Sequence, residues 1–70
     1  MENRNDRFKR IAIRRTNNIL NQIRLLGNLS NKSTYDYSDE EVNKIFSAIE
    51  AQLRIAKAKF HSHKKKEFHL

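Results

Sequence analysis

Residues that interrupt regular structure are almost missing from this 70-residue chain: proline does not occur, and glycine occurs once, at Gly27. Because proline and glycine most often end helices and strands, their rarity favours long, uninterrupted helices. Gly27 and Asn28 both accept a left-handed backbone conformation at low cost, so we expect a first helix to end there. The composition therefore predicts an all-α protein.

Apolar residues recur at three- and four-residue spacing in two segments, at about residues 4–27 and 38–60. In the first segment they are Phe8, Ile11, Ala12, Ile19, Ile23 and Leu26. In the second segment they are Val42, Ile45, Phe46, Ile49, Leu53, Ala56 and Phe60. This spacing places them along one side of a helix, so each segment predicts an amphipathic helix. The loop, at about residues 28–37, is short, and a short loop favours an antiparallel two-helix hairpin over residues 1–60.

The start of the second helix has a clear local signal. Ser38 is followed three residues later by Glu41, which is the spacing of a capping box. Asp39, Glu40 and Glu41 would lie in the first turn, where the helix dipole favours negative charge. These residues predict a helix that begins at about residue 38.

Both helices carry apolar residues outside their main stripes. These additional residues are Ile13, Leu20, Ala48, Ala51, Ile55 and Ala58. Two helices that face only each other would leave them uncovered, and a chain of about 70 residues rarely forms a sufficient core alone. We expect a four-helix bundle, completed by a second copy in a homodimer or by another protein. A marginally stable monomer is the alternative.

The charge of the chain is strongly positive and unevenly distributed. The net charge is +7, and thirteen of the fifteen basic residues fall in two blocks. The first block is Arg4, Arg7, Lys9, Arg10, Arg14, Arg15 and Arg24; the second is Arg54, Lys57, Lys59, Lys64, Lys65 and Lys66. A hairpin would join the blocks into a basic pole, opposite an acidic turn at residues 36–41. Residues 61–70 form a basic tail that we expect to be partly helical or disordered.

Such a basic pole suits a polyanion or an acidic protein surface. Arg7, Arg10 and Arg14 follow an i, i+3, i+7 spacing, and the planar guanidinium group binds phosphate well. The predicted binding residues are Arg7, Arg10, Arg14, Lys57, Lys59, Lys64, Lys65 and Lys66. The alternative is that these charges only keep a helix face in water.

Several functional classes are disfavoured by the composition. Without cysteine there is no disulfide or thiolate metal site, and His61, His63 and His69 lack the spacing of helical metal ligands. No set of nucleophile, base and orienting group is present, so we expect no enzyme and no cofactor. The absence of a long apolar run predicts no membrane segment or signal peptide, and hence a cytoplasmic protein.

Three stretches carry a resemblance to a known group of proteins: residues 25–33, 35–42 and 44–50. Over roughly residues 16–60 the chain resembles small helical-hairpin proteins of bacterial phages and other mobile elements. The most specific part is the Y-x-Y-S-x-E-E-V pattern at residues 35–42. The resemblance implies a helical hairpin and supplies no activity. The architecture is also similar to that of plasmid copy-number regulators, which dimerise as helical hairpins and bind RNA.

These features lead to one main hypothesis and two alternatives. The main hypothesis is a small non-enzymatic binding protein of a mobile element that engages nucleic acid or a nucleoprotein through its basic pole. The first alternative is a phage-type inhibitor or adaptor that docks on a host protein with an acidic surface, using the apolar residues given above. The second alternative is a scaffolding component of a larger assembly.

Overall fold

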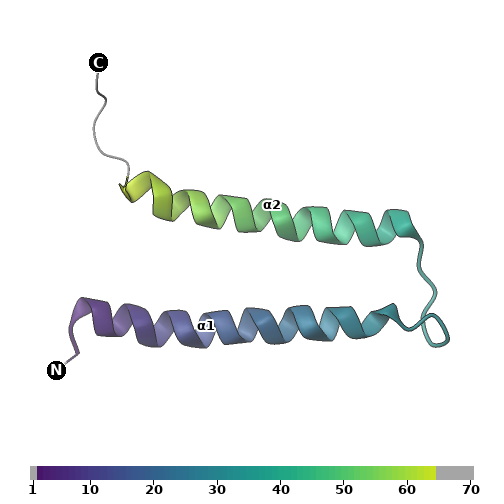
Figure 1. Cartoon of the computed structure of the whole chain (residues 1–70), viewed down its shortest axis with the longest axis horizontal. Coiled ribbons are helices and arrows are strands. Elements are labelled where there is room, and N and C mark those ends of the chain that lie inside the picture. The colour runs from purple at the N-terminus through teal and green to yellow at the C-terminus, as the bar shows by residue number, and fades with distance from the viewer. Residues whose placement is uncertain (1, 65–70) are drawn as a thin grey trace, which may run out of the picture. The chain divides into compact units, whose positions relative to one another are not determined.

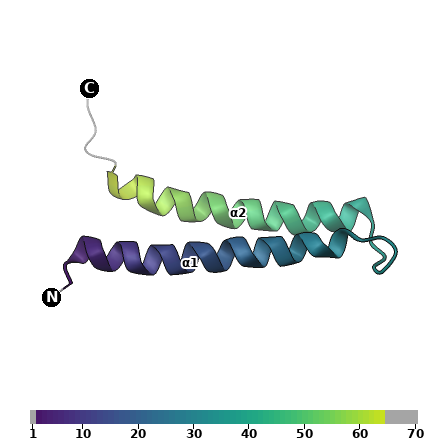
Figure 2. The same cartoon turned by 60° about the horizontal axis from the view of Figure 1, so that its bottom comes forward.

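The computed structural model describes residues 2–64, and side chains are described as far as residue 61. It contains helix α1 (Arg4–Gly27), the 3-10 turn η1 (Asn28–Ser30) and helix α2 (Asp39–Lys64) (Figures 1 and 2). No strand is present between residues 2 and 64. The predicted all-α class is therefore confirmed, and the two helices correspond to the two segments of three- and four-residue apolar spacing.

Helix α1 begins at an asparagine cap. The Asp6 backbone N–H donates to the Asn3 Oδ1 at 2.7 Å, and the Arg7 backbone N–H donates to the Asn3 carbonyl at 3.0 Å. Asn3 itself is extended, with φ −86° and ψ 177°. A side chain that satisfies a free N–H in the first turn stabilises a helix start, so the first turn of α1 is fixed by Asn3.

The end of α1 differs from our expectation of a left-handed cap. Gly27 has φ −62° and ψ −26°, and no residue of the described chain has a positive φ. The helix instead tightens into η1, and the Asn28 N–H donates toward the carbonyls of Arg24, Leu25 and Leu26. Since a 3-10 turn satisfies the last carbonyls of a helix without a left-handed residue, Gly27 is not needed there for its conformational freedom.

The segment after η1 contains a turn built by Asn31. Its Oδ1 accepts from the Ser33 backbone N–H at 3.0 Å and from the Ser33 hydroxyl at 2.6 Å. Its carbonyl accepts from the N–H groups of Thr34 and Tyr35 at 3.1 and 2.9 Å. An asparagine that bonds to the backbone two residues later is typical of a tight turn. The first half of the connection is thus a hydrogen-bonded turn.

Helix α2 begins with the capping box that the sequence predicts. The Glu41 backbone N–H donates to the Ser38 Oγ at 3.1 Å, and the Ser38 backbone N–H donates to the Glu41 Oε1 at 2.8 Å. The Val42 N–H donates to the Ser38 carbonyl at 3.1 Å. The helix continues beyond position 60 as far as Lys64. Residues 65–70 of the expected tail lie outside the described residues.

The chain divides into two units, Met1–Asp36 and Tyr37–Leu70, and each is described by itself. The first contains α1, η1 and the Asn31 turn, and the second contains α2. Two helices of 24 and 26 residues are the elements that a helical hairpin requires. Their antiparallel packing and the completion of a four-helix bundle stay predictions.

Candidate nucleic-acid interface

The strongest candidate for a binding surface is a row of three arginines on α1. Arg7, Arg10 and Arg14 are all exposed. At 3.6 residues per turn, their positions fall within about 60° of the helix circumference, and the rise from Arg7 to Arg14 is about 10.5 Å. We call these three residues the arginine row. They form a line of positive charge along one side of a helix, an arrangement that would suit an extended polyanion.

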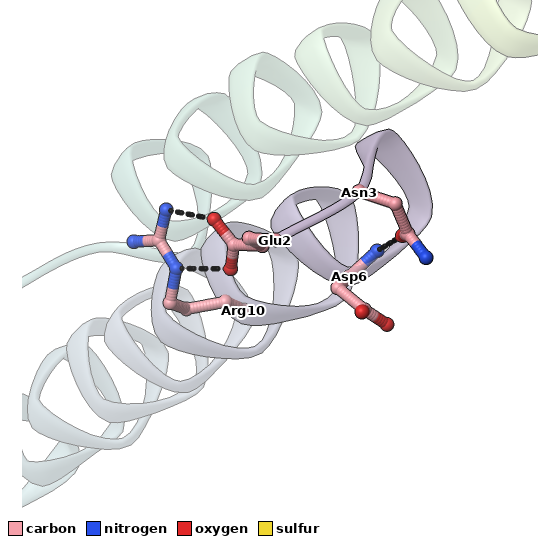
Figure 3. A network of polar contacts seen from close by, with 4 residues as sticks. All are labelled: Glu2, Asn3, Asp6 and Arg10. Carbon is pink, nitrogen blue, oxygen red and sulfur yellow. Dashed lines mark hydrogen bonds and ion pairs between the residues drawn. The ribbon is translucent and has the colours of Figure 1, made fainter.

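One member of the row is already engaged by a carboxylate (Figure 3). The Arg10 Nε donates to the Glu2 Oε2 at 2.8 Å, and the Arg10 Nη2 donates to the Glu2 Oε1 at 3.1 Å. Both side chains are solvent-accessible, with exposed fractions of 56% for Arg10 and 37% for Glu2. The Glu2 carboxylate, which accepts both hydrogen bonds, raises the pKa of Arg10 above its ordinary value.

Sequence reasoning did not identify Glu2 as part of this surface. Glu2 and Arg10 are eight residues apart, which is not a spacing at which two residues of one helix become neighbours. The contact forms because Glu2 precedes α1 and the chain enters the helix through the extended residue Asn3. The acidic charge beside the basic block was a usable signal, but the pairing depends on backbone geometry before the helix.

Arg7 and Arg14 differ from Arg10 in that neither is paired with a carboxylate in the described part of the chain. Within residues 2–61, whose side chains the structure describes, neither of these two side chains has a hydrogen-bonding or ion-pair partner. The next acidic residue along the chain is Asp6, which lies in the first turn of α1, where the helix dipole favours negative charge. Two of the three members of the arginine row are therefore open to an external anion.

The basic residues predicted on α2 do not form one row. Lys57 and Lys59 are both exposed. Two positions apart on a helix is a rotation of about 200°, so these lysines lie on different sides of α2. Lys57 instead shares a side with Arg54, three residues earlier. The side chain of Lys64 and the whole of Lys65 and Lys66 lie outside the described part of the chain.

Apolar side chains are also accessible on both helices. No side chain from Glu2 to His61 is buried. On α1, Ile13 and Leu20 are 62% and 59% exposed, and on α2 Ile55 is 51% exposed. Of the predicted interface alanines, Ala51 is half-buried, and Ala48 and Ala58 are exposed. Each helix taken alone therefore presents apolar surface to a partner.

Other kinds of site find no support in the described residues. Across that part of the chain, no group of three histidine, aspartate or glutamate side chains is placed to hold a metal ion. No helix there combines the length and apolarity needed to cross a membrane. Comparisons with protein-family models, curated proteins and solved structures gave no match. The case for function therefore depends on the surfaces of the two helices.

Proposed function

We propose that this chain is a small, non-enzymatic binding protein of a mobile element that engages nucleic acid or a nucleoprotein through its basic residues. The observation that supports the proposal is the arginine row, in which Arg7 and Arg14 have no partner among the described residues. With a net charge of +7, the chain would also be drawn to a polyanion over longer distances. We place this activity in the cytoplasm, with the protein acting as a homodimer.

The row suits contact with phosphates more than reading of bases. Arginine binds a phosphate through two parallel N–H donors, and such contacts position a protein without reporting sequence. Phe8 is the one aromatic residue between Arg7 and Arg14, and it lies at least about 100° around the helix from each arginine of the row. The row therefore lacks the interleaved aromatic side chains that stacking on single-stranded bases would require. We therefore propose binding that depends on the backbone, with Lys57 and the lysines of residues 64–66 adding further contacts.

The salt dependence of binding tests this proposal. Binding of a short fluorescein-labelled DNA duplex is followed by anisotropy at several salt concentrations. Each phosphate contact contributes about −0.9 to the slope of log affinity against log salt on duplex DNA. We expect Arg7→Ala and Arg14→Ala each to weaken binding and to reduce the slope by about 0.9.

Arg24→Ala is the matched control for these variants. It removes the same charge from α1, but Arg24 lies in the last turn and its side chain donates to Asn21. We expect the Arg24 variant to keep the wild-type slope. Equal losses for all three variants would mean that only net charge matters, and unchanged affinity at low salt would exclude the arginine row as a binding surface.

A second candidate function is supported by the exposed apolar residues. In a phage-type inhibitor or adaptor, the apolar faces would dock on one host protein and the basic residues would meet its acidic surface. Affinity purification from nuclease-treated lysate separates the candidates. A stoichiometric protein that stays bound without nucleic acid, and is lost when Leu20 is replaced by glutamate, favours the inhibitor.

A further inference from the structure

Glu2 occupies the edge of Arg10 at which a guanidinium group binds phosphate. Its two carboxylate oxygens accept from two different nitrogens of Arg10, at 2.8 and 3.1 Å (Figure 3). Parallel paired N–H donors are the geometry that arginine uses with phosphate oxygens as well as with carboxylates. The Glu2 carboxylate therefore lies where one phosphate group of a bound nucleic acid would lie.

We propose that Glu2 is an internal mimic of phosphate, and that Arg10 is a phosphodiester-binding site closed by Glu2 in the free chain. On binding, a backbone phosphate of nucleic acid displaces Glu2 from Arg10. This inference rests on the proposed function, and it adds a regulatory role for a residue outside the basic block. The proposal predicts that the chain binds nucleic acid more weakly than it would if Arg10 were not paired with Glu2.

The local structure permits Glu2 to leave without disturbing α1. The helix cap is made by Asn3, whose side chain and carbonyl accept from the N–H groups of Asp6 and Arg7. Glu2 makes no contribution to that cap. Its displacement would therefore cost the ion pair with Arg10 and would leave the first turn of the helix intact.

The competition should favour a polyanion over Glu2. The pair between Glu2 and Arg10 is exposed at 37% and 56%, and exposed ion pairs are weak. Among the described residues Glu2 bonds only to Arg10, whereas a nucleic-acid strand would also meet Arg7 and Arg14 along the same row. Glu2 is thus strong enough to reduce affinity by a factor of up to about five, and too weak to prevent binding.

A pair of charge-matched variants isolates this effect. Glu2→Gln and Glu50→Gln both raise the net charge by one, but Glu50 is an exposed residue of α2 without an ion-pair partner among the described residues. We expect Glu2→Gln to tighten binding of a DNA duplex by about two- to fivefold more than Glu50→Gln does. In an Arg10→Ala background, the two variants should have equal effects. Equal effects in the wild-type background would overturn the proposal.

A second measurement tests the site without nucleic acid. The Arg10 Nε–H resonance is followed by nitrogen-15 NMR during titration with pyrophosphate, a compact phosphate-containing anion. We expect its midpoint to fall by about two- to fivefold in Glu2→Gln and to stay nearly unchanged in Glu50→Gln. An Arg10 resonance that responds identically in all three proteins refutes the inference. A positive titration without any duplex binding would leave the phosphate site standing and would remove the proposed function.

Discussion

Gly27 adopts a backbone conformation that does not need the conformational freedom of glycine. Its φ of −62° is right-handed, and a Cβ added there would meet no atom within 4 Å. Glycine in a helix is less favourable than alanine by about 0.5–1 kcal/mol. We therefore expect Gly27→Ala to stabilise the chain by roughly that amount, measured by urea unfolding with far-UV circular dichroism.

A second substitution, Gly27→Asn, tests whether the backbone of residue 27 is right-handed or left-handed in solution. Asparagine tolerates the left-handed region better than alanine does, but it is a weaker helix former. For the right-handed Gly27, stability should follow the order alanine, asparagine, glycine. The reverse order would show that residue 27 is left-handed in solution, as the sequence had led us to expect.

At the scale of the element, the start of α2 depends on a few local hydrogen bonds. Ser38→Ala would remove the Oγ that accepts from the Glu41 N–H at 3.1 Å. Loss of a serine N-cap costs about 1 kcal/mol, so the urea midpoint should fall accordingly. Ser47→Ala is the control, because Ser47 lies within α2, is exposed and should gain slightly from the better helix former. A Ser38 variant as stable as the Ser47 variant would contradict the role of the capping box.

Much at this scale could be predicted from sequence, because helix periodicity and capping are local. The apolar spacing gave both helices, and Ser38 with Glu41 gave the start of α2. Helix α1 ends at Gly27 as predicted, but the left-handed conformation expected for its cap was wrong, since a 3-10 turn and a left-handed glycine cap satisfy the same carbonyls. In the candidate site, the arginine row followed from spacing alone. Glu2 did not, because the contact depends on an extended residue before the helix.

At the scale of the whole molecule, the exposed apolar side chains are the basis on which we predict a partner. Helices gain most of their stability in proteins from the packing of an apolar face. From Glu2 to His61 no side chain is buried, and large apolar residues such as Phe8, Leu53 and Phe60 are more than half exposed. Fully burying one such side chain contributes about 1.5–3 kcal/mol. Association of two copies would supply this burial and would also double the number of arginine rows.

The prediction at this scale is therefore a homodimer. Sedimentation equilibrium at micromolar concentration should give twice the chain mass of 8.4 kDa. Leu20→Glu places a charge on an apolar side chain that is 59% exposed, and it should weaken association by at least about tenfold. Asn17→Glu makes a comparable change seven residues from both Arg10 and Arg24, on the arginine side of α1, and should leave the mass unchanged.

A wild-type chain that sediments as a single species of 8.4 kDa would exclude the dimer. The chain would then be the marginally stable monomer, or its apolar faces would be covered by a different protein, as the inhibitor or adaptor hypothesis requires.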